Sequence, residues 1–355
     1  MIFICIKRDV LIASLFFIFT QMKKNISLFT ACVFIFCSNA FAQSAKDLEE
    51  TARSFMQQSD YANAILVLNR AIQMEPRNLD IAKDLSLSYY MQQDNVKALE
   101  IIKPLLDRDD ADDQCYQIAG NIYKQLQQVK ECDKLYRKGI KKFPESGAMY
   151  NELGELLWAQ QDYAAIKQWE KGIEVDPGFS KNYFNASKYY FLTPDKIWSI
   201  LYGEIFINME PFSSRTPEIK TILLDSYKKL FAEATLSVPA DEKNKFTDAF
   251  IATMNKQSAV AANGINAETL VMIRSRFILD WYNDYAEKIP FRLFELQRQL
   301  LQDGMFEAYN QWIFGSVQNL AAYQNWTTLH AAEYNDLTRF QRGRIFKIPT
   351  GQYYK

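Results

Sequence analysis

The sequence predicts an almost all-α protein, and two observations carry this prediction. Only 12 Gly and 10 Pro interrupt 355 residues, of which 48% are apolar, so long apolar-periodic segments run between few helix breakers. A 34-residue period also recurs from Ala45 to about Pro211. Its helix-ending segments close on Pro76, Pro144, Pro177 and Pro211, and Asp110 stands where a further proline would fall. A period of this length is typical of stacked helix pairs.

The first 42 residues are predicted to be an export signal and not part of the fold. From Met22, two lysines precede an apolar run, and Ala40-Phe41-Ala42 supplies a small-residue cleavage site. The apolar run is shorter than the roughly 20 residues that span a bilayer. We therefore expect cleavage after Ala42, an exported protein, and no integral membrane span after cleavage.

A further apolar segment occupies residues 1–21, and two interpretations of it stay open. In the first, translation starts at Met22, which begins a complete signal by itself. In the second, translation starts at Met1 and the two apolar segments form a membrane anchor. Lipid attachment at Cys37 is disfavoured because Phe36 precedes it where a small residue is needed.

Charge and residue content exclude several classes of function. Without residues 1–42 the chain keeps 37 basic and 41 acidic groups, a net charge of −4, which is no electrostatic footprint for nucleic acid. Cys115 and Cys132 occupy repeat positions that place their Cα atoms beyond the roughly 7 Å limit for a disulfide. The acidic run 107–113 lacks the glycine and terminal glutamate of a calcium loop, and His330 has no metal-ligand spacing. We expect no catalytic residue, no metal and no cofactor.

Five repeats are predicted in residues 45–213, beginning at Ala45, Leu79, Asp113, Gly147 and Ser180. Positions 8 and 20, where the two helices of a repeat approach, are small in every repeat. Position 8 is Ala52, Ser86, Gly120, Gly154 and Ser187; position 20 is Ala64, Ala98, Cys132, Ala165 and Ser199. Position 11 is always large, and position 24 is large except for Gly203. Small residues let the backbones approach while large ones fill the adjacent space.

This joint pattern resembles the tetratricopeptide repeat (TPR), which implies a solenoid of about five helix pairs with a protein-binding concave side. Helix positions 5, 9 and 12 would line that groove, because a helix turns about 100° per residue. The candidate partner-binding residues are Arg53, Lys83, Tyr90, Asn121, Lys124, Asn151, Trp158, Lys188 and Phe191. Basic groups would hold carboxylates of a protein or peptide partner, and aromatic ones would anchor it. Packing against the next repeat or the C-terminal region is the alternative role of Trp158 and Phe191.

Residues 214–355 continue as an aromatic-rich helical domain without the period. We expect helices at 216–234, 241–257 and 266–287, one ending at Gly304, short ones through Trp312, and a last stretch at 319–342. Their aromatic spacing favours core packing, with a ligand pocket as the alternative. The segments LYGEIFINMEPFSSRTPEI, FRLFELQRQLLQDGMFEAYNQW and FKIPTGQYYK resemble an exported bacterial TPR family of unknown function, which implies architecture and export only.

The leading hypothesis is an exported protein-interaction scaffold or adaptor, periplasmic, envelope-associated or secreted. One alternative is an adaptor in outer-membrane or envelope assembly. Another is a binder of glycans or small molecules that uses the aromatic C-terminal region. No set of acid, base and nucleophile can be assembled by spacing, so we do not expect an enzyme.

Overall fold

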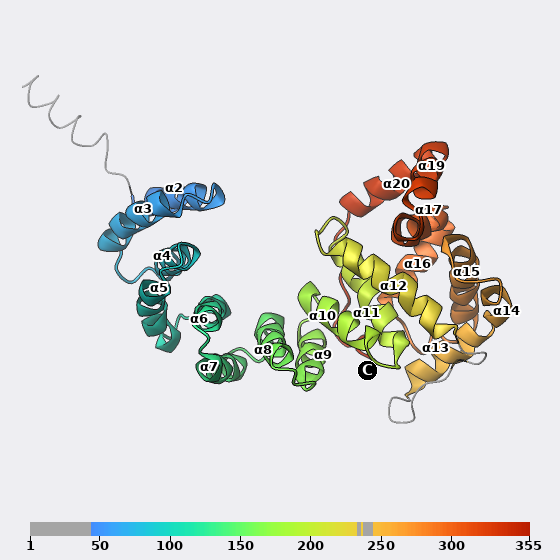
Figure 1. Cartoon of the computed structure of the whole chain (residues 1–355), viewed down its shortest axis with the longest axis horizontal. Coiled ribbons are helices and arrows are strands. Elements are labelled where there is room, and N and C mark those ends of the chain that lie inside the picture. The colour runs from blue at the N-terminus through green and yellow to red at the C-terminus, as the bar shows by residue number, and fades with distance from the viewer. Residues whose placement is uncertain (1–43, 233–235, 237–243) are drawn as a thin grey trace, which may run out of the picture. The chain divides into compact units, whose positions relative to one another are not determined.

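The computed structural model describes residues 44–232, 236 and 244–355, and every regular element within them is helical (Figure 1). The predicted all-α class is therefore confirmed. The predicted signal segment lies outside the described residues. The described residues divide into two compact units, one within residues 1–105 and one within residues 106–355.

The repeat region consists of consecutive helix pairs, whose first members we call A helices and whose second members we call B helices. They are α2 (Ala45–Gln57) and α3 (Tyr61–Met74), α4 (Leu79–Met91) and α5 (Asn95–Ile102) followed by η1 (Lys103–Asp107), α6 (Asp113–Gln125) and α7 (Val129–Lys142), α8 (Gly147–Ala159) and α9 (Ala165–Val175), and α10 (Ser180–Phe191) and α11 (Lys196–Met209). Each A helix begins at the residue where the sequence period places the start of a repeat.

Short polar residues determine where four of the A helices begin. Ser44, Asn78, Asp112 and Ser146 precede α2, α4, α6 and α8, and each side chain accepts a hydrogen bond from a backbone amide of the first turn. Such caps satisfy amides that have no partner inside the helix. Phe179 precedes α10 and supplies no side-chain cap. That helix start depends on tertiary contacts instead, since the Ser180 hydroxyl donates to Glu210 at the end of α11.

The turns between the A and B helices share one backbone conformation in the first four pairs. Ser59, Gln93, Gln127 and Gln161 all adopt left-handed φ angles of 56–66°. In each turn the following amide donates back to a carbonyl in the last turn of the A helix, as Gln128 N does to Tyr123 O at 2.9 Å. This geometry closes a helix end, although glycine would adopt it with less strain.

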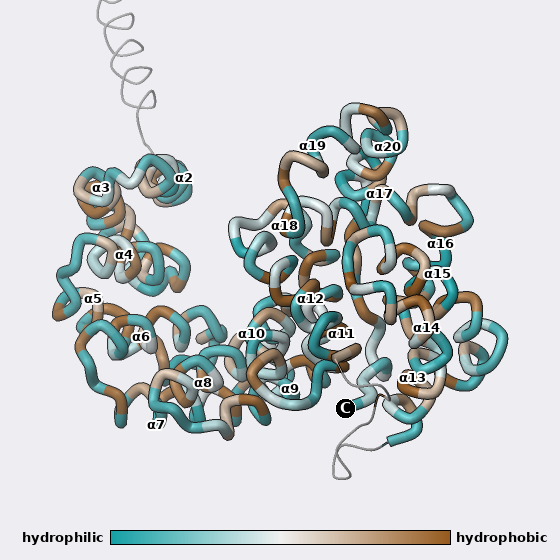
Figure 2. The backbone as a smooth tube through the Cα atoms, turned by 45° about the vertical axis from the view of Figure 1, so that its right-hand side comes forward, coloured by the Kyte–Doolittle hydropathy of each residue, from teal (hydrophilic) through white to brown (hydrophobic). Residues whose placement is uncertain are grey.

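Small residues at positions 8 and 20 bring the paired helices together, as the sequence indicates. Ala52 and Ala64 are both fully buried between α2 and α3. A Cβ added to Gly154 would lie 2.3 Å from Nε1 of Trp169 on the paired helix, so only glycine fits there without a shift. Figure 2 shows hydrophobic and hydrophilic segments alternating along these helices, as expected where one face is buried.

The C-terminal helices follow the repeats within residues 106–355. They are α12 (Thr216–Leu230), α13 (Lys245–Asn255), α14 (Ser258–Ala261), α15 (Ala267–Asp284), α16 (Arg292–Gln302), α17 (Phe306–Asn310), the π-helical η3 (Gln311–Gly315), α18 (Ser316–Gln318), α19 (Leu320–Leu329) and α20 (Ala331–Arg342). The helices expected to reach 234 and 287 end earlier, at Leu230 and Asp284. The last expected helical stretch breaks at His330, and the expected start at 241 lies outside the described residues.

Helix stacking continues beyond the last predicted repeat, because α12 packs against α11 and also contacts α10. The hydroxyls of Ser199 and Ser226 lie 3.0 Å apart across this contact. A Cβ on Gly203 would lie 2.8 Å from Ser187 Oγ and 3.1 Å from Leu223 Cδ2. The glycine at position 24 of the fifth repeat, which departs from the pattern, therefore makes room for α12 in the place of a further A helix.

A buried ionic network joins α11 to the C-terminal helices. The Arg274 guanidinium on α15 donates to Glu204 on α11, and both side chains are at most 2% exposed. The Glu204 carboxylate also accepts from Gln297 Nε2 at 2.7 Å and from the Tyr309 hydroxyl at 2.9 Å. Arg274 donates further to Asn310 Oδ1. Every ion in this site therefore has a charged and a neutral partner, which burial of charge requires.

Candidate partner-binding face

The predicted groove residues of the longer unit lie on three A helices, α6, α8 and α10, of which α8 contacts both others. We call their positions 5, 9 and 12 the A-helix face: Gln117, Asn121 and Lys124 of α6; Asn151, Glu155 and Trp158 of α8; Phe184, Lys188 and Phe191 of α10. Asn121, Lys124, Lys188 and Phe191 are half-buried, and Trp158 is 36% exposed. These five side chains are therefore within reach of solvent.

Each lysine of this face forms an ion pair with a glutamate two helices further along the chain, from α6 to α8 or from α10 to α12. Lys124 Nζ lies 2.7 Å from Glu152 Oε2 on α8, and that carboxylate also accepts from the Tyr136 hydroxyl at 3.1 Å. Lys188 Nζ lies 2.6 Å from Glu218 Oε1 on α12. A partner's carboxylate would compete with these acids, so the lysines are less available than the sequence alone implies.

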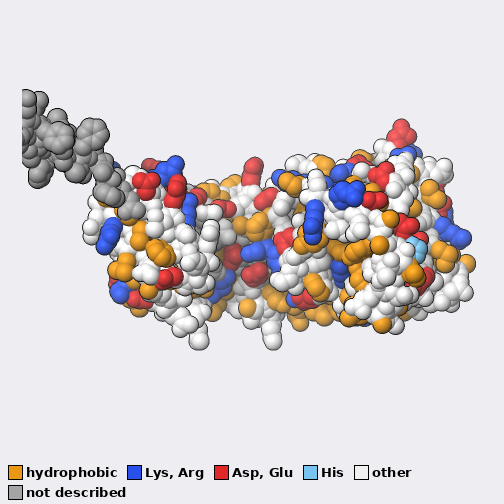
Figure 3. All heavy atoms as spheres, turned by 90° about the horizontal axis from the view of Figure 1, so that it is seen from above, with side chains coloured by type: hydrophobic (Ala, Val, Ile, Leu, Met, Phe, Trp, Pro, Cys, Tyr) orange, Lys and Arg blue, Asp and Glu red, His pale blue; other side chains and the backbone are white. Residues whose placement is uncertain are grey.

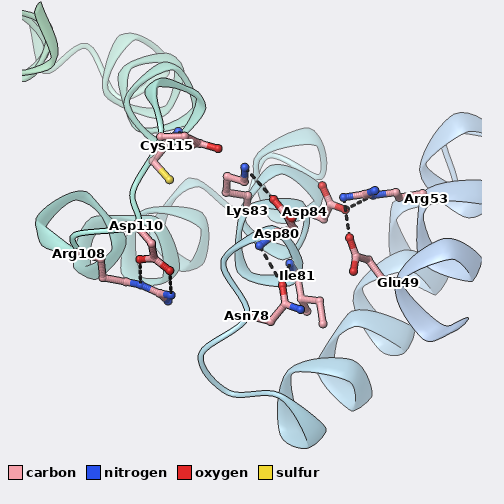
Figure 4. A network of polar contacts seen from close by, with 11 residues as sticks. Glu49, Arg53, Asn78, Asp80, Ile81, Lys83, Asp84, Arg108, Asp110 and Cys115 are labelled. Carbon is pink, nitrogen blue, oxygen red and sulfur yellow. Dashed lines mark hydrogen bonds and ion pairs between the residues drawn. The ribbon is translucent and has the colours of Figure 1, made fainter. Parts of the chain in front are cut away.

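The shorter unit shows the same pairing between its two A helices, α2 and α4 (Figure 4). Arg53 lies 2.7 Å from Asp84 and 2.6 Å from Glu49, and the hydrogen bond to Asp84 raises the pKa of the guanidinium. Lys83 pairs with Asp80 at 2.9 Å, and its side chain is only 8% exposed. Tyr90 is half-buried. Lys83 thus differs from its predicted role as an open contact for a partner.

Asn151 also differs from that role, because it is fully buried in an amide cluster. Its Nδ2 donates to Glu155 Oε1 at 3.1 Å, and its Oδ1 accepts from Asn185 Nδ2 at 2.9 Å. The stripe drawn from sequence cannot separate such a residue from an exposed one, since both lie on the same side of α8. The cluster connects α8 to α10 and fixes the spacing of the A-helix face.

Aromatic rings gather around Trp158 at the end of α8. Its ring centroid lies 5.8 Å from Tyr189, 6.0 Å from Trp169 and 6.1 Å from Tyr163. Trp169 is buried, whereas Tyr163 is 68% exposed. Trp158 therefore packs against the next repeat, as the alternative interpretation expected, and also keeps a third of its surface exposed. Sequence reasoning missed Tyr163 and Tyr189, which lie outside the stripe positions.

Phe191, which occupies on α10 the position that Trp158 occupies on α8, contacts the C-terminal region. Lys229 Nζ on α12 lies 3.8 Å from its ring centroid, and Lys196 Nζ lies 5.7 Å from it. Such contacts between ammonium groups and a ring face are attractive. On the side of the molecule that Figure 3 shows, basic and acidic side chains are interspersed. The open part of the face is thus aromatic, with lysines around it that already have partners.

The remaining predicted chemical groups have structural roles in the described residues. The thiols of Cys115 and Cys132 are buried, and burial raises the pKa of Cys132 to about 11, which keeps it protonated. His330 Nδ1 lies 2.7 Å from Glu333 Oε2, and its ring stacks on Trp326. Within residues 44–232, 236 and 244–355, His, Cys, Asp and Glu form no cluster of three or more that could hold a metal ion. In the same residues, no helix is both long and apolar enough to cross a bilayer.

The aromatic C-terminal residues are mostly core. Phe246 shows how they pack, because its ring lies 5.6 Å from Trp198, 5.2 Å from Phe291 and 6.2 Å from Phe294. All four rings are at most 4% exposed. Rings buried against one another offer a sugar no face on which to stack, so the glycan alternative gains no support from them.

Comparisons with known proteins agree with the helix-pair geometry. Two tetratricopeptide repeat models match residues 55–122 and 113–142. Residues 55–142 therefore contain tetratricopeptide repeats, which confirms the resemblance drawn from positions 8, 11, 20 and 24. Members of this family are generally protein-interaction scaffolds without catalytic activity. No curated protein matches the chain.

Several solved structures are similar to this chain. A thermophilic TPR protein of Thermus thermophilus is 11% identical, with a TM-score of 0.44 over 51% of this chain and 100% of that one. The pilF protein of Pseudomonas aeruginosa is 13% identical, with a TM-score of 0.45 over 52% and 85%. MamA of Desulfovibrio magneticus is 14% identical, with a TM-score of 0.38 over 49% and 99%. Similarity at this level of identity and TM-score does not indicate a shared function.

Proposed function

We propose that this protein is an exported scaffold that binds a protein partner through the A-helix face of residues 106–355. The observation that carries the proposal is the exposed aromatic group around Trp158. Trp and Tyr are among the residue types that contribute most of the binding energy in protein interfaces. Here such rings stay exposed beside lysines that are held in ion pairs. The paired lysines would then orient the partner more than they would add affinity.

Photo-crosslinking tests this proposal directly. A crosslinking amino acid at Tyr189 should capture a discrete partner in living cells, whereas the same group at Leu279, which is 67% exposed on α15, should not. With the partner purified, Trp158→Ala together with Phe191→Ala should weaken binding by tenfold or more, and Leu279→Ala should leave it unchanged. Equal binding by the two variants would refute the assignment of the face.

The export part of the proposal rests on the signal pattern of residues 22–42. N-terminal sequencing of the protein from an envelope or periplasmic fraction should give Gln43 as the first residue. A chain that retains Met1 or Met22 in that fraction would refute cleavage, and would favour the anchored alternative. Partner capture from the envelope fraction is also the observation that would favour an envelope-assembly adaptor.

A further inference from the structure

A lysine side chain is enclosed in a cage at the turn between α10 and α11. The Nζ of Lys355 lies 5.0 Å from the ring centroid of Tyr190, 5.8 Å from that of Trp198, and 3.6 Å from Asp195 Oδ2. Tyr190, Asp195 and Trp198 are all at most 5% exposed. We call these three residues the lysine cage. Aromatic faces combined with a carboxylate are a recognised way to bind an ammonium group.

The carboxylate of the cage is arranged for a cation. Asp195 Oδ1 accepts from Ile197 N at 3.1 Å and caps α11, whereas Oδ2 is buried and faces the Lys355 amine. Burial raises the pKa of Asp195, and Lys355 acts against this shift. Glu170 on α9, which accepts from the Tyr190 hydroxyl at 2.6 Å, is half-buried, and desolvation raises the pKa of its carboxyl group. The buried carboxyl group of Asp195, with the carboxyl group of Glu170 bound to the Tyr190 hydroxyl, favours a positive occupant.

The occupant belongs to a segment without regular secondary structure, residues 352–355, whose side chains and backbone contact the helices. The chain after α20 forms no helix, and Tyr354 stacks on Phe246 at 4.9 Å between ring centroids. The Tyr354 carbonyl accepts from Asn244 Nδ2 at 2.9 Å, and Gln352 Oε1 accepts from Arg292 N at 2.6 Å. An aromatic anchor and a lysine anchor are thus held by adjacent residues of one short segment.

We propose that the lysine cage and the ring of Phe246 form a binding site for an extended segment of a partner protein in which an aromatic residue precedes a lysine, and that residues 352–355 are an internal occupant that such a partner displaces. None of these residues belongs to the A-helix face, so this site is independent of the one proposed above. Because the occupant is tethered, its effective concentration is on the order of millimolar, and the partner must overcome that competition.

A peptide supplied in trans tests the proposal. A chain that lacks residues 352–355 should bind a labelled peptide with the sequence GQYYK saturably in an anisotropy titration. Binding should weaken at least tenfold when the peptide lysine is replaced by glutamate or when the protein carries Asp195→Asn, and the full chain should bind more weakly than the shortened one. Absence of saturable binding by a shortened chain that keeps its helical circular dichroism would overturn the proposal, as would equal binding of the glutamate peptide.

A second variant covers the case in which the shortened chain does not fold. Lys355→Ala empties the cage but leaves Tyr354 in place. Its melting temperature should rise in n-butylammonium chloride relative to sodium chloride of equal ionic strength, and Asp195→Asn in the same background should abolish the rise. No difference between the two salts would overturn the cage.

Discussion

Replacing Arg274 by methionine should destabilise residues 106–355 by about 3–5 kcal/mol, because it leaves a buried carboxylate without its counter-ion. The side chains of Arg274 and Glu204 are 2% and 1% exposed, so water cannot take the place of the guanidinium. Only the neutral donors of Gln297 and Tyr309 would remain on Glu204. Methionine fills much of the space, so the loss of packing is the smaller part of the effect. The expected loss is a large fraction of a typical domain stability of about 5–15 kcal/mol.

Urea denaturation followed by tryptophan fluorescence isolates this effect. All six tryptophans lie within residues 106–355, so the fluorescence transition reports on that unit and not on residues 1–105. Arg276→Met, two residues along the same helix at an exposed position, is the matched control and should change the free energy of unfolding by less than about 0.5 kcal/mol.

The double variant Glu204→Gln with Arg274→Met separates charge from shape. Removing both charges leaves no buried ion without a partner, so the double variant should recover about 2 kcal/mol relative to the sum of the single losses. If Arg274→Met alone lay within about 1 kcal/mol of the wild type, the reasoning that an unpaired buried charge dominates at this site would be refuted.

Two further outcomes follow from particular residues. Burial lowers the pKa of Lys220 from 10.5 to about 7. Between these two pH values the lysine is neutral in the folded chain and protonated in the unfolded one, so the stability of the wild type should rise as the pH goes from 7 to 10. Lys220→Met should therefore be more stable than the wild type at pH 6. The difference in the free energy of unfolding should be at most about 5 kcal/mol, because the Trp312 ring favours the charged lysine. This difference should shrink toward pH 10, and a difference that stays constant with pH would contradict the prediction. Gln127→Gly should raise the free energy of unfolding by about 0.5–1 kcal/mol, because the backbone φ at residue 127 is 56°, which glycine adopts with less strain. Gln125→Gly, at the end of α6, should lower the free energy of unfolding by a similar amount. Equal effects of the two substitutions would refute the role of φ.

The starts of the first four repeats could be predicted because their determinants are local, whereas the start of the fifth follows from the period alone. The caps at Ser44, Asn78, Asp112 and Ser146 act within one helical turn, and the small residues at positions 8 and 20 repeat at a fixed spacing. The ends of the C-terminal helices were less predictable, because no period applies there. The break at His330, for example, has neither a proline nor a glycine to mark it.

Contacts between distant residues were not predictable from the pattern. Glu204 and Arg274 are 70 residues apart, and each looks like an ordinary surface charge on a helix. The lysine cage likewise joins Lys355 to a turn some 160 residues earlier in the chain, and nothing at either end signals the other. Periodicity shows which side of a helix faces inward, but a buried ionic pair depends on which helices meet there.

The ion pairs of the A-helix face determine where its specificity can arise. Lys124 and Lys188 already have carboxylate partners at 2.7 and 2.6 Å, so a partner protein's carboxylate would exchange one ion pair for another. A partly exposed pair is worth about 0–1 kcal/mol, and the net gain from such an exchange is smaller still. Covering the exposed third of Trp158 and the ring of Tyr163 removes apolar surface from water without breaking any existing pair. Discrimination between partners should therefore depend on how well an apolar side chain fits against these rings, and the charges should chiefly affect the rate of encounter.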